Sequence, residues 1–166
     1  SIVGTISSAS DYDTYAIEVS AAGKLTVNLV TSETDSYGWI YGVVDAEGNV
    51  LASDECSNYA ASCTAGRSME VGLSGAGTYY IRIVSAVSYS VPSGSYTVTA
   101  TYSDETGGVE LEPNETYATA QAITSGESIV GTISSASDYD TYAIEVSAAG
   151  KLTVNLVTSE TDSYGW

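Results

Sequence analysis

Apolar and polar residues alternate along most of this chain with a period of two residues. The alternation is clearest in five runs, at residues 15–19, 25–29, 69–73, 79–83 and 96–102. A period of two is typical of strands that bury one face and expose the other. Glycine-containing turn signals separate the runs. The pattern predicts seven to nine short strands and an all-β fold, an antiparallel β-sandwich of jelly-roll type.

Two segments between these runs need separate interpretation. Residues 116–123 come closest to helical spacing, and we expect at most one or two helical turns there. Residues 45–49 contain acidic and amide side chains, as calcium-binding loops do. The glutamate that an EF-hand loop needs further along the chain is missing. A hairpin turn with Gly48 at positive φ is the better interpretation.

The sequence also repeats itself. Residues 128–166 are identical to residues 1–39, so that Ser128 corresponds to Ser1 and the repeat length is 127 residues. A unit of this length has the usual size of a domain. We therefore expect tandem 127-residue repeats cut from a longer array. Residues 1–104 would form a β-sandwich repeat without its first segment, residues 105–109 a linker, and residues 110–166 the first part of the next identical repeat.

Composition excludes several classes of function. The chain has no histidine, so it cannot build a Ser-His-Asp or Cys-His catalytic set, and we expect no enzymatic activity. Four basic residues against 21 acidic ones give a net charge of −17, which argues against nucleic-acid partners. No apolar run approaches the roughly 18–20 residues of a membrane helix, so membrane insertion is not expected.

Two cysteines lie seven residues apart in a polar segment, Cys56 and Cys63. They are too few for a zinc site without histidine. A local disulfide is the leading interpretation, with a pair of unreactive thiols or a bond between neighbouring subunits as alternatives. A disulfide would imply an oxidising compartment, and therefore a secreted or cell-surface location.

An acidic cluster follows the predicted linker. In an extended chain Glu110, Glu112 and Asn114 point to the same side, and Asp138 and Asp140 do so at the start of a later strand. If the two segments meet, their oxygens converge and repel unless a hard cation binds between them. Calcium, which takes six to eight oxygen ligands, suits such a site better than magnesium. The alternative is a solvated acidic linker.

Several of these residues belong to short motifs that together resemble a known family. The motifs cover residues 112–116, 130–133, 138–142 and 150–154, and continue in the first copy at residues 45–51, 77–83 and 94–98. The set resembles the bacterial pre-peptidase C-terminal domain, which is related to the collagen-binding modules of clostridial collagenases. The resemblance spans almost the whole 127-residue unit, although each motif alone is weak.

The resemblance implies a β-sandwich on a secreted protein, used as an accessory module without catalysis. Some family members bind calcium through an acidic linker and aspartates on a following strand. The matching residues here are Glu110, Glu112, Asn114, Glu115, Asp138 and Asp140. Glu115 stands where an aspartate is commoner. Asp11 and Asp13 would serve a preceding linker, so we expect their site to be incomplete unless a neighbouring chain supplies the missing strand.

The function that these observations favour is mechanical. We expect a non-catalytic, secreted repeat protein that forms a calcium-stabilised extracellular fibre or adhesin stalk, with neighbouring identical repeats or subunits as partners and an extracellular polymer or cell surface as a further target. The alternative is a collagen- or carbohydrate-binding accessory module of a secreted hydrolase. Trp39 and Tyr41 are its candidate ligand-binding residues, although core packing is the other interpretation of both.

Overall fold

The computed structural model describes residues 1–32, 38–57 and 63–158. These residues form strands and turns, and none of them forms a helix that could span a membrane. The strands are β1 (Ile2–Gly4), β2 (Tyr12–Val19), β3 (Gly23–Thr31), β4 (Trp39–Val44), β5 (Val50–Cys56), β6 (Arg67–Leu73), β7 (Gly77–Ser85), β8 (Tyr96–Ser103), β9 (Leu111–Glu112), β10 (Gln121–Ile123) and β11 (Tyr142–Ile144). All five alternating runs fall in strands, which confirms the all-β prediction.

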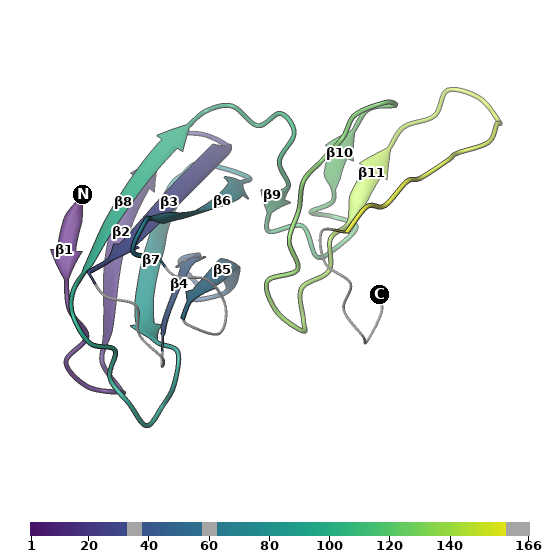
Figure 1. Cartoon of the computed structure of the whole chain (residues 1–166). Helices are drawn as coiled ribbons and strands as arrows, with labels where there is room; N and C mark the ends of the chain where they lie inside the picture. The colour runs from purple at the N-terminus through teal and green to yellow at the C-terminus, as the bar shows by residue number, and fades with distance from the viewer. Residues whose placement is uncertain (33–37, 58–62, 159–166) are drawn as a thin grey trace.

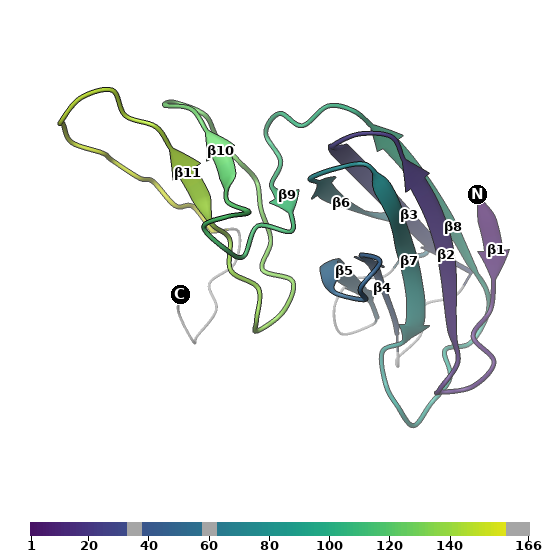
Figure 2. The ribbon, with the colours of Figure 1, turned by 180° about the vertical axis from the view of Figure 1, so that it is seen from behind.

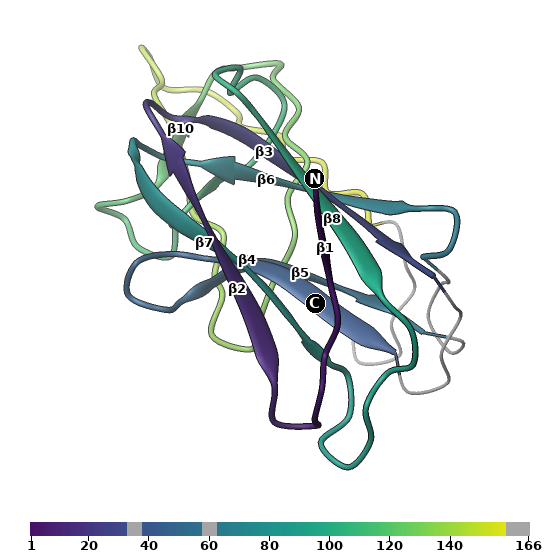
Figure 3. The same cartoon turned by 90° about the vertical axis from the view of Figure 1, so that its left-hand side faces the viewer.

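Two sheets make a sandwich from the first copy of the repeat. One sheet has the order β1-β8-β3-β6-β9 and the other the order β2-β7-β4-β5. Neighbouring strands are antiparallel except β9, which runs parallel to β6. The two sheets face each other across the core (Figures 2 and 3). The predicted antiparallel-rich sandwich is therefore confirmed.

Alternation along the strands fills the space between the sheets. Leu25, Val27 and Leu29 of β3 are fully buried, as are Tyr41 of β4 and Ile83 of β7. Each fully buried aliphatic side chain stabilises the fold by about 1.5–3 kcal/mol relative to an exposed one. The apolar period of two is thus explained by burial of one face of each sheet.

Both segments of ambiguous pattern contain a turn. Gly48 has a φ of 90° in the turn between β4 and β5, and the Asp45 carboxylate accepts hydrogen bonds from the turn, which confirms the hairpin prediction. Residues 116–123 form no helix and contain one turn, within the expectation of at most one or two turns. Thr119 N–H bonds to the Thr116 carbonyl in a single turn, and the chain then enters β10, because β10 pairs with β11.

Residues 128–158 pair differently from their counterparts in the first copy, residues 1–31. β11 pairs in parallel with β10, and residues 150–158, which repeat β3, form no strand (Figure 1). Leu152 and Val154 are 57% and 80% exposed, whereas their counterparts Leu25 and Val27 are buried. Within the described residues, the strands that flank β3, namely β6 and β8, occur once and already pair with the first copy.

Candidate metal centre

The acidic segment, residues 108–115, extends one sheet of the sandwich. Its strand β9 pairs with β6, with Gly72 opposite Leu111 and Leu73 opposite Glu112. Gly72 permits this close approach, because a Cβ at that position would lie 1.8 Å from the carbonyl oxygen of Glu110. Backbone pairing therefore fixes the acidic segment to the first copy.

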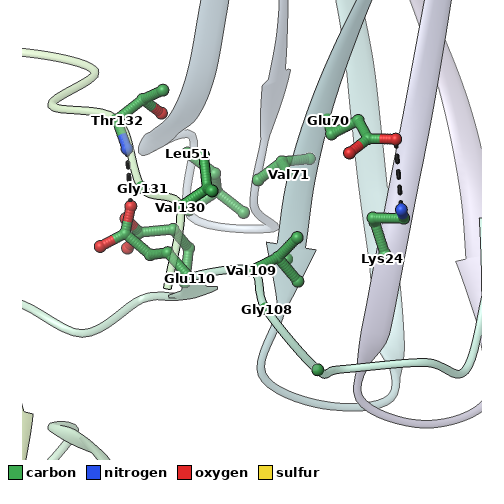
Figure 4. Close-up of a pocket in the computed structure, with 13 residues that line it drawn as sticks. Lys24, Leu51, Glu70, Val71, Gly108, Val109, Glu110, Val130, Gly131 and Thr132 are labelled. Carbon is green, nitrogen blue, oxygen red and sulfur yellow. Dashed lines mark hydrogen bonds and ion pairs between the residues drawn. The ribbon is translucent and has the colours of Figure 1, made fainter. Parts of the chain in front are cut away.

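The second copy binds the acidic segment from the other side. Val109 and Val130 form a parallel bridge. Glu110 N–H donates to the Val130 carbonyl at 3.0 Å, and Val130 N–H donates to the Gly108 carbonyl at 3.1 Å. A cavity of about 290 Å³ lies at this junction and is lined from both parts of the chain (Figure 4). The acidic segment thus lies between the sandwich and the second copy.

Acidic side chains converge where these two parts meet. One group of carboxylates consists of Glu110, Glu112 and Asp140, and a second consists of Glu112, Glu115 and Asp138. In each group one oxygen from every residue lies within 4.8 Å of the others. Glu110 and Glu112 are 5% and 3% exposed. The spacing suits oxygens arranged around a common cation, with ligand distances of about 2.3–2.6 Å.

Hydrogen bonds hold the Glu110 carboxylate in this position. Its Oε1 accepts from Asn114 Nδ2 and from the Tyr142 hydroxyl, both at 2.9 Å. Its Oε2 accepts from Thr132 N–H at 2.9 Å, and Figure 4 shows this last bond. Asn114 is fully buried, and its Oδ1 accepts from Thr141 N–H at 3.3 Å. Asn114 therefore connects the acidic segment to the strand that follows the two aspartates.

Three carboxylate oxygens of the cluster are buried without a hydrogen-bond partner among the described residues: Glu112 Oε1, Asp138 Oδ1 and Asp140 Oδ1. The second oxygen of Glu112 accepts from Asn114 N–H at 3.2 Å, and that of Asp138 accepts from Ser134 N–H. A buried oxygen left without a donor costs about 1–3 kcal/mol, more when it is charged. A cation bound within each of the two carboxylate groups would give these oxygens a partner.

Burial and mutual repulsion perturb the acids of this cluster. Burial, followed by the charges of Glu110 and Asp138, raises the pKa of Glu112 to about 8. Burial, followed by the charge of Glu110, raises the pKa of Asp140 to about 7. Burial and the hydrogen bond to Glu110 also raise the pKa of the Tyr142 hydroxyl. The cation-free cluster therefore keeps protons at neutral pH that exposed carboxyl groups would lose.

These pKa values predict a pH dependence of stability. In the unfolded chain Glu112 and Asp140 lose protons near their ordinary values of 4.5 and 3.8, whereas the folded protein holds them to about 8 and about 7. Their stabilisation is complete below the unfolded values and is lost as the pH rises through the folded values. Without divalent cations, we expect the urea midpoint to fall as the pH rises from about 4 to about 8. The fall should be less steep in Glu112→Gln, which lacks one of the two titrating groups. A wild-type midpoint that rises, or a variant with the same slope, contradicts the prediction.

The equivalent acids of the first copy do not form such a cluster in the described residues. Asp11 Oδ2 accepts from the N–H and hydroxyl of Ser7, both at 2.7 Å. Asp13 accepts from the hydroxyl of Tyr96, which also hydrogen-bonds to the Tyr15 hydroxyl at 2.6 Å. Asp11 makes the same contact with Ser7 that Asp138 makes with Ser134, but only Asp138 and Asp140 also lie beside carboxylates of the acidic segment.

The remaining predicted residues have clear outcomes. Cys56 and Cys63 form a disulfide, with Cα atoms 5.5 Å apart, which confirms the local pairing. The candidate ligand surface at Trp39 and Tyr41 is wrong, because these side chains are 1% and 0% exposed. Tyr96 packs edge-on against the Trp39 ring at 5.4 Å, which accounts for part of this burial. Both aromatics serve the core.

Sequence reasoning missed three participants in the site: Gly131, Thr132 and Tyr142. A Cβ on Gly131 would lie 2.6 Å from Glu110 Oε2, so this glycine makes room for the carboxylate. Thr132 contributes only a backbone N–H, which no side-chain pattern reveals. Tyr142 follows two residues after Asp140 on the same face of the extended chain, and this spacing was the available signal.

Comparison with known proteins agrees with the fold. The model of the family described as bacterial pre-peptidase C-terminal domain matches residues 11–85, which run from the start of β2 to the end of β7. No curated protein matches the chain. Domains of this kind are typically extracellular, and the Cys56–Cys63 disulfide fits that location. Residues 11–85 are thus similar to the bacterial pre-peptidase C-terminal domain, a kind of extracellular accessory or binding module.

Proposed function

We propose that the chain is a non-catalytic structural module of an extracellular fibre or adhesin stalk, in which calcium ties each repeat to the next. One observation carries the proposal: the acidic segment and the second copy together enclose two groups of carboxylates with three unpartnered buried oxygens. Such an arrangement is costly in a protein that only needs a soluble linker. It is favourable in one that binds a divalent cation at the seam.

The chemistry of the donors favours calcium over other metals. All candidate ligands are oxygens, from carboxylates of Glu110, Glu112, Glu115, Asp138 and Asp140. Hard divalent cations prefer such ligands, whereas zinc and copper sites use nitrogen and sulfur. Calcium accepts six to eight oxygens in variable geometry, and magnesium requires a near-ideal octahedron. A site assembled from two separate parts of the chain suits the more tolerant ion.

A cation in this position would stiffen the seam. β9 is joined to β6 of the preceding sandwich, while Val109 and Glu110 are joined to Val130 of the following copy. Without a cation, repulsion between the carboxylates opposes this double attachment. With the charge neutralised, both attachments persist together. A flexible chain of domains would then become a rod.

Charge and repetition agree with a fibre. The identical residues at positions 1–39 and 128–166 suit a polymer of equivalent units better than a set of specialised domains. The net charge of −17 would keep neighbouring fibres apart in solution. The alternative of a collagen- or sugar-binding module loses its two candidate residues, since Trp39 and Tyr41 are buried.

Thermal unfolding with and without calcium tests the proposal. Calcium at a hundredfold excess over its Kd should stabilise the folded chain by about 2.7 kcal/mol. We expect circular dichroism to give a higher Tm in calcium than in chelator, with magnesium at the same concentration as the matched control. Small-angle scattering should show a narrower distribution of distances with calcium. Equal Tm values in calcium and chelator would refute the metal site.

A further inference from the structure

The outer edge of β2 in the first copy has the same sequence as an edge of β11 in the second copy, and β10 pairs with that edge of β11. β11 is identical in sequence to residues 15–17 of β2. β11 pairs in parallel with β10, with Gln121 opposite Tyr142 and Ile123 opposite Ile144. β2 is the terminal strand of its sheet and pairs there with β7 alone among the described strands. The outer edge of β2 is therefore the counterpart of the β11 edge that β10 occupies.

The backbone of β2 presents the required groups to solvent. Ala86 N–H donates to the Gly38 carbonyl, so residues 80, 82 and 84 of β7 direct their hydrogen bonds to β4. Residues 79, 81 and 83 then bond to β2, where they face Ile17, Tyr15 and Asp13. It follows that the N–H and C=O groups of the intervening residues, 14 and 16, point away from β7.

The same groups bind β10 in the second copy. Gln121 N–H donates to the carbonyl of Thr141, at 3.0 Å, and Thr141 is the counterpart of Thr14. Residues two apart in a strand direct their hydrogen bonds to the same side, so Ala143 also faces β10 and corresponds to Ala16. The outward edge of β2 thus has the sequence and the backbone direction of an edge that is known to accept β10.

The outer edge of β1 is the counterpart of a second edge that the acidic segment occupies, the one at Val130. Val130 exchanges two backbone hydrogen bonds with residues 108 and 110. Its counterpart Val3 is 70% exposed, in a strand whose described partner is β8. Residues 108–110 and 121–123 belong to one continuous segment, 108–123. A single segment would therefore satisfy both open edges, as it does in the second copy.

Residues 108–123 of the same molecule do not cover these edges. Residues 111–112 pair with β6, at the end of the sheet opposite to β1 (Figure 1). We propose that the outer edges of β1 and β2 bind residues 108–123 of a second copy of this chain. The two surfaces are different, so the contact is head-to-tail and can repeat from one molecule to the next.

The first copy is the better acceptor for this segment. Its strands β1 and β2 are already ordered by pairing with β8 and β7, so docking there fixes few additional residues. The second copy binds the segment with its own apolar side chains still in solvent, for example Val146 and Leu156, at 70% and 76% exposure. Docking on the first copy therefore places the segment against strands that other strands already support.

Docking brings acidic groups together and in that respect rests on the proposed function. Glu110 and Glu112 of the incoming segment would approach Asp11 and Asp13, as they approach Asp138 and Asp140 in the second copy. The Tyr15 hydroxyl, now bonded to Tyr96, would bond to the incoming Glu110, as Tyr142 does. Calcium should therefore strengthen the association.

Matched proline variants of the 166-residue chain test the docking. Ala16→Pro removes an outward N–H from an edge strand, where proline is tolerated. We expect sedimentation velocity to show concentration-dependent association of the wild type in calcium, and association weakened about tenfold or more in Ala16→Pro. Ala143→Pro disturbs the same position within the molecule, releases the segment and should strengthen association. A synthetic peptide of residues 105–127 should compete with both interactions and reduce the size of the polymers.

The outcomes separate docking from metal binding. Calcium binding, measured by calorimetry on the same samples, with no association at any concentration overturns the docking and leaves the metal site intact. Association that is unaffected by chelator supports the docking and removes calcium from it. Equal effects of Ala16→Pro and Ala143→Pro overturn the proposal. Urea unfolding followed by circular dichroism reports whether Ala16→Pro retains its core, and if it does not, peptide competition on the wild type decides.

Discussion

Replacing Leu29 by alanine is expected to lower the free energy of unfolding by about 2–5 kcal/mol, whereas the same replacement at Leu156 should change it by no more than about 0.5 kcal/mol. The two leucines occupy equivalent positions in identical sequences. Leu29 lies in β3 with 0% of its surface exposed, and Leu156 is 76% exposed. Truncation of Leu29 leaves a cavity between the sheets, while truncation of Leu156 removes a side chain that solvent already surrounds.

Urea unfolding followed by circular dichroism measures both values on the same chain. Each variant serves as the control for the other, because the local sequence and the chemical change are the same. Val27→Ala and Val154→Ala provide a second matched pair, with 0% and 80% exposure. Similar losses at Leu29 and Leu156 would mean that residues 150–158 are packed in solution, in contradiction to the structure.

Glu112→Gln is expected to have opposite effects with and without calcium. At a pH above about 8, where Glu112 would otherwise be ionised, the variant without cations should be more stable by roughly 1–3 kcal/mol, because a buried carboxylate no longer faces Glu110. In calcium the variant should lose most of the stabilisation of about 2.7 kcal/mol expected at a hundredfold excess over Kd. Glu112 belongs to both groups of carboxylates, so one substitution weakens both.

Thermal unfolding at high pH, with calcium and with chelator, gives the four values needed. Glu145→Gln is the matched control, since this glutamate is exposed and lies outside both carboxylate groups. The control should respond to calcium as the wild type does. A Glu112→Gln variant that is less stable without cations would show that the carboxylate contributes through its hydrogen bonds rather than repelling its neighbours. A full calcium response in the variant would exclude Glu112 as a ligand.

The alternation of apolar and polar residues predicted where most strands lie, but it did not predict which strands pair with each other. The period-two runs identified β2, β3, β6, β7 and β8, because each of these strands buries one face and exposes the other. The pattern did not indicate β10, where a helix-like run forms a strand instead. β10 exists because β11 offers it a partner, and strand pairing between distant segments leaves no local trace in a short run.

The candidate metal centre was predictable only as far as local strand geometry determines it. Alternation of oxygen-bearing residues at 110, 112 and 114 places them on one face, and this follows from strand geometry alone. That the face meets Asp138 and Asp140 depends on the bridge between Val109 and Val130. Asp11 and Asp13 have the same flanking residues as Asp138 and Asp140, but they belong to no carboxylate group among the described residues, and Asp13 accepts a hydrogen bond from Tyr96 instead.

The sequence by itself determined the all-β character of this protein, the repeat of 127 residues, the acidic charge and the cysteine pair, since each of these follows from local alternation, identity or composition. Only the tertiary structure decided which copy of an identical segment is buried: Leu25 lies between two sheets, and Leu152 lies in solvent. The physical reason is that a strand obtains its hydrogen bonds and its buried face from neighbouring strands, and β6 and β8 pair with the first copy.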